Sequence, residues 1–374
     1  MSHRLLDERN IASPALLFFP DIIRSNIAAV IAHAGDPNRL RPHVKTHKTV
    51  EITKLQLAAG VTKHKCATIA EAEMLAMAGA SDVLLAYPLV GPNIARFVAL
   101  RTAYPATQFS AVVDHSLPLE ELIAAQRSEP LPIFVDIDMG MNRTGAPFDL
   151  VPELARRISA TRQLRFAGFH AYDGHANQES HAERESGIRS RLITLLALRS
   201  KLEREGIPVL SLVCGGTPGF PIYAKLHDIP GLECSPGTYV LHDHGYGSKY
   251  PDLTGLAPAA ILLSRVISRP TANRVTLDLG NKAVAADPLL ARRIHLLDFP
   301  PHTPIMHSEE HYVVETAEAE RYRPGDVVYA VPGHVCPTVA LHREALIVEH
   351  GTVTGSWLIA ARDRKLHIEL RSCS

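Results

Sequence analysis

One lysine stands where amine chemistry could take place. The run Arg41-Pro-His-Val-Lys45-Thr-His-Lys48 overlaps a segment, residues 39–44, whose pattern predicts a strand. Desolvation at the end of a buried strand can remove a lysine's charge, and the uncharged amine is a nucleophile that can form a Schiff base with an aldehyde. Pro42 and Val44 indicate that Lys45 points inward, whereas Lys48 is expected to begin the next helix and face solvent. The alternative is a surface lysine in a basic loop.

Two glycine-rich segments further along the chain could hold a phosphate. Residues 214–219 read Cys-Gly-Gly-Thr-Pro-Gly and residues 235–239 read Ser-Pro-Gly-Thr-Tyr, each directly after a predicted strand. Glycines let the backbone approach closely, and free N–H groups can point at an oxyanion beside a threonine hydroxyl. Glycine-rich turns are common, so either segment alone is a weak indication. Together with a strand-end lysine they favour a phosphate-bearing aldehyde cofactor, pyridoxal 5′-phosphate.

A third pattern, His334-Val335-Cys336, could bind a metal ion. Residues two apart on an extended segment point to the same side, so both side chains could face one ion. Neutral imidazole and thiolate together suit zinc. This spacing also arises by chance, and the alternative is a buried structural cysteine.

Alternating strands and helices between Pro20 and Tyr239 must position the lysine and the glycine loops. About eight strand–helix alternations fit a (β/α)8 TIM-type barrel, with a doubly wound open sheet as the alternative. A barrel commonly binds phosphate at the loops after its seventh and eighth strands, where the two glycine-rich segments fall. The strands are expected at residues 39–44, 64–67, 82–87, 109–114, 133–138, 164–170, 210–214 and 232–235.

After Gly255 the pattern changes to strands with few helices between them. Strands are expected at residues 260–268, 274–278, 310–315, 326–331 and 345–349. The fold class predicted is therefore α/β, a barrel followed by a C-terminal all-β domain. We expect the barrel domain at residues 13–245, and a β domain made of residues 1–12 and 246–374 that carries the metal ligands.

Composition narrows the class of protein. Lys plus Arg and Asp plus Glu both number 39, and a balanced charge argues against a nucleic-acid or anionic-membrane partner. Neither a membrane-spanning run nor the apolar core of a signal peptide is evident. The five cysteines are scattered and odd in number, which disfavours a disulfide framework and suits a reducing, cytoplasmic setting.

The lysine segment resembles that of the fold-type III pyridoxal-phosphate enzymes, and more narrowly the D-threonine aldolase and D-serine dehydratase family. The resemblance covers nearly the whole chain in order. It implies an alanine racemase-like barrel with a C-terminal β domain, to which the first residues usually add a strand, and a homodimer. It continues through Gly140-Met-Asn-Arg143-Thr-Gly145, Gly168-Phe-His-Ala-Tyr172-Asp-Gly-His175, Gly215-Gly-Thr217-Pro, Pro236-Gly-Thr238-Tyr, Asp278-Leu-Gly280 and Gly333-His334-Val-Cys336-Pro.

The resemblance also implies roles for individual residues. Lys45 would carry the cofactor, and Tyr172 would lie near its ring. Arg143 would contact the phenolic oxygen or otherwise tune the cofactor's charge, with a rim salt bridge as its alternative. His334 and Cys336 would hold a divalent metal near the substrate hydroxyl. The phosphate would be held by Gly216, Thr217, Gly237 and Thr238.

Some family features lack a clear counterpart in this chain. Aldolases of the family often have aspartate, with manganese or magnesium, where this chain has Cys336; dehydratases typically have cysteine with zinc. The histidine that some aldolases place beyond the tyrosine could be His175, which is then a catalytic candidate, or His181. His311 could approach the metal or be a surface residue.

The predicted activity is a lyase reaction on a D-3-hydroxy amino acid. Retro-aldol cleavage of a D-threonine-type substrate to glycine and an aldehyde is placed first, and dehydration of D-serine to a 2-oxo acid and ammonia second. An amino-acid racemase and a non-catalytic cofactor-binding protein are the remaining alternatives. The C-terminal β domain argues against the latter, because barrels of that kind lack it.

Overall fold

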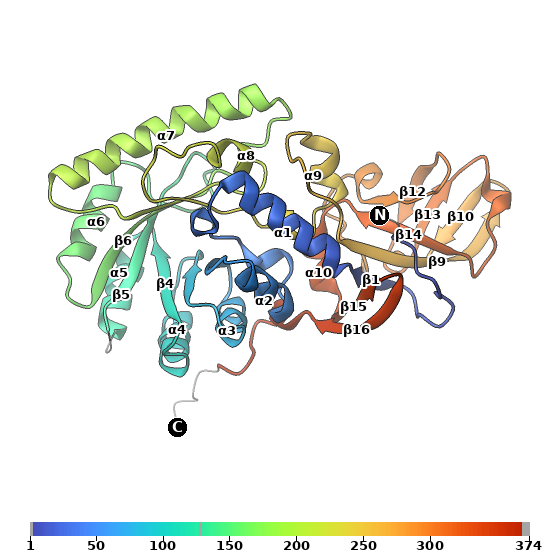
Figure 1. The fold of residues 1–374 in the computed structure, drawn as a ribbon, viewed down its shortest axis with the longest axis horizontal. Coiled ribbons are helices and arrows are strands. Elements are labelled where there is room, and N and C mark those ends of the chain that lie inside the picture. Colours follow the sequence, from blue (N-terminus) through green and yellow to red (C-terminus); the bar gives the residue numbers. More distant parts are fainter. Residues whose placement is uncertain (1–2, 127–128, 369–374) are drawn as a thin grey trace. The chain divides into compact units, whose positions relative to one another are not determined.

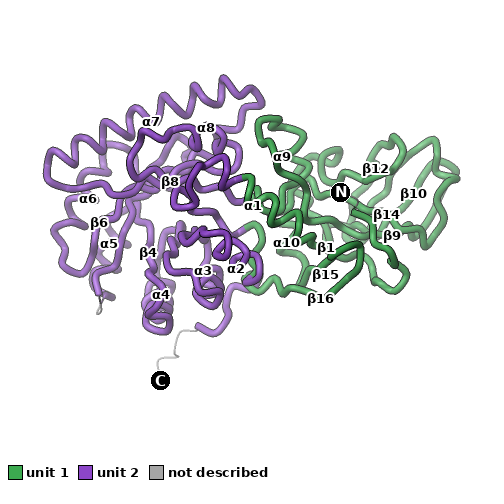
Figure 2. The backbone as a smooth tube through the Cα atoms, in the orientation of Figure 1, with its two compact units in different colours: residues 1–29, 46–49, 238–362 green, residues 30–45, 50–237, 363–374 purple. Residues whose placement is uncertain are grey.

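The computed structural model describes residues 3–126 and 129–368 and divides into two compact units (Figure 2). Unit 1 comprises residues 1–29, 46–49 and 238–362, and unit 2 comprises residues 30–45, 50–237 and 363–374. The first helix, α1 (Pro20–Ala34), contributes to both. The domain boundaries expected from the sequence stay a prediction.

A curled, seven-stranded parallel sheet forms the centre of unit 2, with helices outside it (Figure 1). Its strands are almost entirely buried; every residue of β5, for example, is buried. Burial on both faces explains why these strands are continuous apolar runs. Neighbouring strands pack Leu84, Val112, Phe134, Ala167 and Val213 into one cluster. The strands are β2 (Lys63–Cys66), β3 (Asp82–Leu85), β4 (Gln108–Val113), β5 (Leu131–Asp136), β6 (Leu164–Ala171), β7 (Ser211–Cys214) and β8 (Leu232–Cys234).

The helices of unit 2 begin where the sequence supplies capping side chains. The Thr68 hydroxyl accepts the N–H of Glu71, whose carboxylate accepts the N–H of Ala67 in return. Ser180 caps the longest helix through the N–H of Glu183. Such caps satisfy N–H groups that have no partner within the helix. The helices are α2 (Val50–Ala58), α3 (Ile69–Met77), α4 (Pro92–Ala103), α5 (Ser116–Ala125), α6 (Val151–Ser159), α7 (His181–Arg204) and α8 (Phe220–Tyr223).

The segment predicted as the first strand, residues 39–44, does not form a regular strand. It makes two isolated parallel bridges instead, Leu40 to Cys234 of β8 and His43 to Lys65 of β2. Pro42 between them has no N–H to donate, although its carbonyl accepts the N–H of Lys65. This bridging segment, residues 39–44, still joins the two edge strands of the sheet and so takes the place of the eighth strand of a barrel.

Unit 1 is built on a mostly antiparallel sheet of nine strands. The five strands expected after residue 255 are present, while β1, β11, β12 and β16 were not assigned from the residue pattern. β1 lies between β9 and β15, so the strand that the resemblance implied near the N-terminus is central to this sheet. The strands are β1 (Ala15–Phe18), β9 (Ala260–Thr271), β10 (Arg274–Leu277), β11 (Ile294–Leu296), β12 (Thr303–His307), β13 (Tyr312–Glu315), β14 (Val327–Pro332), β15 (Glu344–Glu349) and β16 (Thr352–Leu358).

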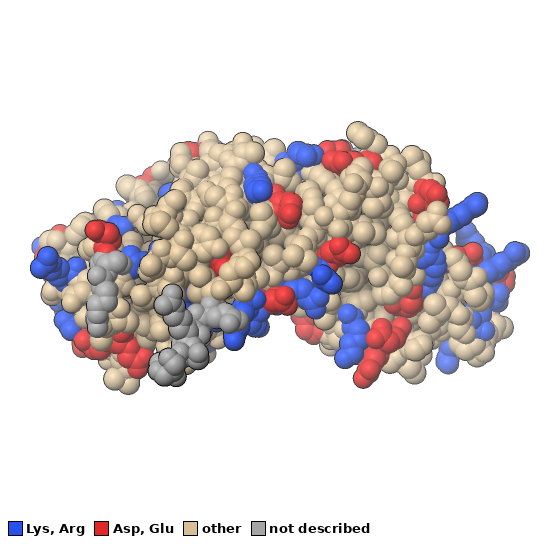
Figure 3. Space-filling view, turned by 90° about the horizontal axis from the view of Figure 1, so that it is seen from below, with Lys and Arg blue, Asp and Glu red and all other residues tan. Residues whose placement is uncertain are grey.

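Two short helices complete unit 1, α9 (His244–Lys249) and α10 (Val335–Leu341). The predicted fold class, a parallel α/β barrel-type sheet followed by a C-terminal β domain, is confirmed. Acidic and basic side chains are interspersed on the face seen in Figure 3, in keeping with the balanced charge. Among the described helices, none has the length and apolar character needed to cross a membrane.

Candidate active site

Lys45 lies in unit 2, in a 3₁₀ turn, Val44–Thr46, directly after the bridging segment. Its side chain is half-buried, and its backbone N–H donates to Nδ1 of His43 at 3.2 Å. The expectation for Lys48 was wrong. Lys48 precedes α2, is half-buried with φ +54°, and donates from Nζ to the carbonyl of Ala361. It belongs to the other unit, so the two lysines of the motif have different surroundings.

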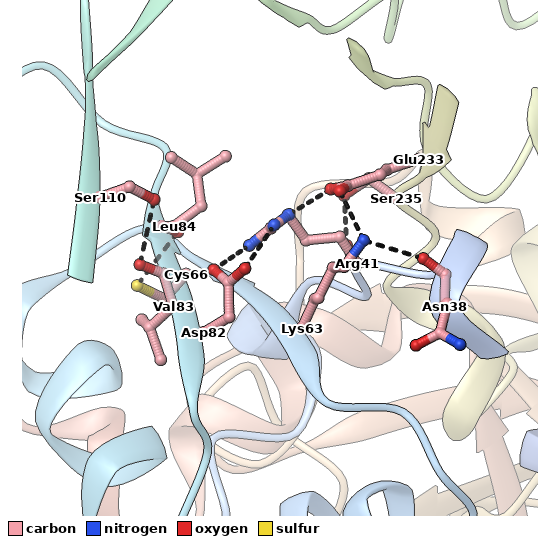
Figure 4. Close-up of polar contacts among 10 residues, drawn as sticks. All are labelled: Asn38, Arg41, Lys63, Cys66, Asp82, Val83, Leu84, Ser110, Glu233 and Ser235. Atoms are coloured by element: carbon pink, nitrogen blue, oxygen red, sulfur yellow. Dashed lines mark hydrogen bonds and ion pairs between the residues drawn. The ribbon is translucent and has the colours of Figure 1, made fainter. Parts of the chain in front are cut away.

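A buried ion-pair network anchors the segment that leads to Lys45 (Figure 4). The guanidinium of Arg41 donates Nε–H to Glu233 of β8 at 2.5 Å and two further N–H groups to Asp82 of β3 at 2.7 and 3.0 Å. Lys63 of β2 donates to the other oxygen of Glu233 at 2.8 Å. These side-chain contacts tie three strands to the bridging segment, in addition to its backbone hydrogen bonds.

The Tyr172 ring, just beyond β6, lies amid three cationic side chains. The ring centroid is 6.0 Å from Nζ of Lys45, 5.6 Å from Nζ of Lys65 and 5.1 Å from Cζ of Arg143. The electron-rich face of an aromatic ring attracts cations at such distances. The structure thus brings Lys45, Tyr172 and Arg143 together, as expected, and adds Lys65, which was not among the expected residues. Arg143 is exposed. These four residues are called the Tyr172 cluster below.

The two predicted phosphate loops meet each other in unit 2. Gly237 donates its N–H to the hydroxyl of Thr217 at 3.1 Å. A Cβ added to Gly216 would lie 3.2 Å from Cε2 of Tyr172, so a side chain here would crowd the space beside that ring. Gly215 has φ +70° and faces the ring of Tyr223, where a Cβ would stand only 2.7 Å away. Glycine is required here for backbone conformation and for close approach alike.

Thr238 was assigned to the same loops but belongs to unit 1, where its hydroxyl lies 3.5 Å from Sγ of Cys336. Thr46, the residue that follows Lys45 in the chain, places its hydroxyl 3.2 Å from the same sulfur. Cys336 is therefore flanked by two threonine hydroxyls.

His334 and Cys336 do meet, although not on an extended segment. His334 is the residue just before α10, where its side chain makes no capping hydrogen bond, and Cys336 lies in the first turn of the helix, a geometry that differs from the one predicted. The ring of His334 is hydrogen-bonded to Cys336, and its Nδ1 lies 2.5 Å from a carboxylate oxygen of Asp287. Burial lowers the pKa of His334, but the contacts with Cys336 and Asp287 outweigh it and raise that pKa to about 9.

This donor set fits a divalent ion of zinc type. A ligating histidine usually gives its second ring nitrogen to a carboxylate, which fixes the ring orientation, and Asp287 occupies that position. Imidazole and thiolate leave two positions open on a four-coordinate ion. In residues 3–126 and 129–368, no group of three or more His, Cys, Asp or Glu side chains is arranged to hold a metal. The pair is therefore at most a partial site made by two protein ligands.

The three other histidine candidates are placed differently. His175 lies in the turn after β6, half-buried, in the same unit as Lys45, and its Nδ1 is buried without a hydrogen-bond partner in the described structure. His181 begins α7 and lies 3.6 Å from Glu185. His311 is exposed in the turn between β12 and β13. Of these, His175 lies closest in sequence to the Tyr172 cluster.

A buried chain of polar side chains, absent from the sequence expectations, leads to the Tyr172 cluster. The carboxylate of Asp136 on β5 lies 2.6 Å from Nδ1 of His170 on β6, and Nε2 of His170 lies 3.3 Å from Nζ of Lys65 on β2. All three side chains are almost completely buried. The strand alternation that directs Lys63 to Glu233 also directs Lys65 inward, which is the sequence signal that could have identified it.

An anionic ligand with an aldehyde group fits the cluster in unit 2. The amines of Lys45 and Lys65 and the exposed guanidinium of Arg143 lie around one ring, and a negatively charged ligand would pair with them. The glycine at position 216 leaves space beside the Tyr172 ring, which a Cβ at that position would partly fill. Phosphate and phenolic oxygens would balance the charge, and Lys45 offers an amine to the aldehyde.

Comparisons with known proteins show what this chain is similar to. A family model described as the alanine racemase N-terminal domain matches residues 20–241, and a serine dehydratase domain model matches residues 259–348. The D-threonine aldolase of an Arthrobacter species is 29% identical over 94% of this chain and 92% of its own length. The 3-hydroxy-D-aspartate aldolase of Paracoccus denitrificans is 29% identical over 96% and 94%. D-Serine dehydratases are also among the relatives.

The solved structure of D-threonine aldolase from Filomicrobium marinum superimposes with a TM-score of 0.86 at 26% identity. It covers 96% of this chain and 98% of its own.

Proposed function

Since the chain belongs to the alanine racemase N-terminal domain family, we propose that it is a pyridoxal-phosphate- and divalent-metal-dependent lyase acting on D-3-hydroxy amino acids. The relatives are aldolases and dehydratases, so an enzyme of the lyase type is supported. The reaction we propose is retro-aldol cleavage of a D-threonine-type substrate to glycine and an aldehyde.

The Tyr172 cluster is the observation that carries this proposal. It gathers an amine nucleophile, Lys45, with two further cations at the edge of paired glycine loops. Bound pyridoxal phosphate would supply the electron sink for bond cleavage at Cα. Lys45 would hold its aldehyde carbon, and Gly216, Thr217, Gly237 and Thr238 would hold its phosphate. Arg143 would approach its anionic ring oxygen.

His334 and Cys336 are the residues we propose as metal ligands, with zinc as the ion. Asp287 would orient the His334 ring through its 2.5 Å contact with Nδ1. A divalent ion supplies Lewis acidity toward a hydroxyl oxygen. We propose His175 as the base that takes the hydroxyl proton, because its buried Nδ1 has no hydrogen-bond partner among the described residues.

Dehydration of D-serine is a second candidate, and Cys336 favours it. Cysteine with zinc is the arrangement that the resemblance associates with dehydratases, whereas aspartate accompanies many aldolases. We place cleavage first because the three relatives at 29% identity are all aldolases. Purified, metal-defined protein should therefore release glycine and acetaldehyde from D-threonine faster than it releases ammonia and pyruvate from D-serine. The reverse ranking would replace the aldolase with the dehydratase.

The cofactor assignment is tested at Lys45. Lys45→Ala should lose the visible absorbance of covalently held pyridoxal phosphate and nearly all activity. Lys48→Ala is the matched control, because that lysine belongs to the other unit and donates to a backbone carbonyl. It should keep the absorbance. A Lys45→Ala protein that retained the band would exclude Lys45 as the cofactor lysine.

The assembly and location of the protein are proposals carried by the resemblance and the composition. We propose a cytoplasmic homodimer with no nucleic-acid or membrane partner. Light scattering of the purified protein at micromolar concentration should give twice the chain mass of 40.8 kDa. A monomeric mass with full activity would contradict the dimer.

A further inference from the structure

Lys65 is given no contact with the cofactor in the function proposed above, yet it is the more deeply buried of the two lysines beside Tyr172. Only 2% of the residue is exposed. Burying an ammonium group without compensation costs several kcal/mol or more, so a buried lysine needs either a partner or a loss of charge. The amine lies on β2, one bridge away from the segment that ends at Lys45.

The hydrogen bonds around Lys65 establish which group donates and which accepts. The Asp136 carboxylate can only accept, so Nδ1 of His170 carries the proton and Nε2 keeps its lone pair. Burial lowers the pKa of His170 despite the carboxylate, in keeping with a neutral ring. The Lys65 amine must then donate one N–H to Nε2, and His170 is the one hydrogen-bond partner that the amine has among the described residues. Within that part of the chain the rest of the amine's hydrogen-bonding capacity is unused.

Charged and titratable groups from several neighbouring segments act on Lys65. Burial is the main cause that lowers the pKa of Lys65 to about 7, and the positive charge of Lys45 is the next. Asp136, Cys214 and Asp173 act in the opposite direction but do not restore its usual value. Part of the lysine population is therefore uncharged at neutral pH. An added negative charge would shift that population toward the ammonium form.

We propose that Lys65 is a cofactor-binding residue: its amine, held by His170 and Asp136, pairs with the phenolic oxygen of bound pyridoxal phosphate and takes up a proton as the cofactor binds. This inference rests on the proposed function. In pyridoxal phosphate the phenolic oxygen is attached to the ring carbon beside the one that bears the aldehyde. A ligand joined to Lys45 therefore presents this oxygen close to the joined carbon. Lys45 and Lys65 lie 6.0 and 5.6 Å from the centroid of one ring, Tyr172, which places both amines around the same space.

The proton balance follows from linkage. The amine of Lys65 gains an N–H bond with a proton from solvent, and its charge is balanced by the phenolate. Because binding favours the charged form, the affinity for the cofactor should fall as pH rises above about 7, by up to tenfold per pH unit. A lysine that merely filled space would give neither effect.

Calorimetric titration of the cofactor-free full chain with pyridoxal phosphate, in two buffers of different ionisation enthalpy and without primary amines, measures this proton uptake. At pH 8 the wild type should take up about one proton more per cofactor than Lys65→Met, which has a similar shape and no charge. Lys63→Met is the control from the same strand, because Lys63 pairs with Glu233 and Asn38. It should behave as the wild type does. Equal uptake by the wild type and Lys65→Met would overturn the inference.

A second measurement needs no variant. The analogue of pyridoxal phosphate that lacks the phenolic hydroxyl should bind to the wild type without the extra proton uptake. If the analogue and pyridoxal phosphate draw the same number of protons, Lys65 does not pair with that oxygen. Failure of the proposed function looks different: the wild type would then form no Lys45-dependent absorbance with pyridoxal phosphate at all.

Discussion

Replacing Arg41 with methionine should destabilise the folded chain by about 3 kcal/mol at neutral pH. The Arg41 side chain is 3% exposed and makes three charge-assisted hydrogen bonds, to Glu233 and Asp82. Removing one partner of a buried ion pair costs roughly 3–5 kcal/mol, because the other charge stays buried without compensation. The lower end applies here, since Lys63 still pairs with Glu233 and the Asp82 side chain is 26% exposed.

The loss should depend on pH through Glu233. Burial alone would raise the pKa of this carboxyl, but Arg41 and Lys63 outweigh it and lower that pKa below its ordinary value of 4.5. A depressed carboxyl pKa contributes stability above the ordinary value and loses it as pH falls through the depressed one. In Arg41→Met the carboxyl pKa should rise, because burial is opposed by Lys63 alone. The difference between the two proteins should therefore be largest near neutrality and shrink below about pH 4.5.

Urea unfolding at neutral and acidic pH measures this difference, and Glu233→Gln completes a double-mutant cycle. Adding Glu233→Gln to Arg41→Met should cost less than adding it to the wild type, because the uncompensated charge is then already present. A loss below about 1 kcal/mol, a loss independent of pH, or strict additivity of the two changes would refute the reasoning.

Three further predictions concern single positions. Gly216→Ala, whose Cβ would stand 3.2 Å from Cε2 of Tyr172, should weaken pyridoxal phosphate binding about tenfold while the unfolding midpoint stays nearly constant; unchanged affinity would show that the cofactor does not use this space. Gly187→Ala, at an exposed position of α7 with nothing near the added Cβ, should stabilise the protein by about 0.5–1 kcal/mol and leave cofactor affinity as it is; a lower melting temperature would contradict this. Cys336→Asp should shift metal content from zinc toward manganese or magnesium in a mixed-metal loading, because a carboxylate is the harder ligand, and an unchanged metal ratio would argue against Cys336 as a ligand.

The alternation of elements in unit 2 was readable from sequence because its strands are buried on both faces. Such strands appear as apolar runs, as in β5, and the helices between them carry caps such as Thr68. The same reasoning failed for the bridging segment. Residues 39–44 have a strand-like pattern, but Pro42 removes one donor and the backbone turns at Val44. Its position is set by side-chain ion pairs with residues far away in sequence, which no local pattern reveals.

The candidate metal pair shows how a contact can be predicted with the wrong local geometry. His334 and Cys336 were expected to share one side of a strand, yet they meet at the start of α10. Pro337 was an available signal, since proline is tolerated in the first turn of a helix. Asp287, whose carboxylate contacts the His334 ring, could not be predicted in this way because no sequence motif links it to His334.

The central place of β1 in its sheet has a consequence for how the chain folds during synthesis. β1 precedes all the other described strands in the chain, but its two partners begin only at Ala260 and Glu344. The whole parallel sheet of unit 2 is made after β1 and before β9, and all seven of its strands are complete by Cys234. Domains generally form as their residues emerge, so unit 2 can become ordered while β1 still lacks both neighbours. An apolar strand with two unpaired edges is prone to pair with other chains. The nascent protein should therefore be most vulnerable to aggregation in the interval before β15 appears, and slow translation or chaperone shortage in that interval should lower its yield more than the stability of the finished fold would suggest.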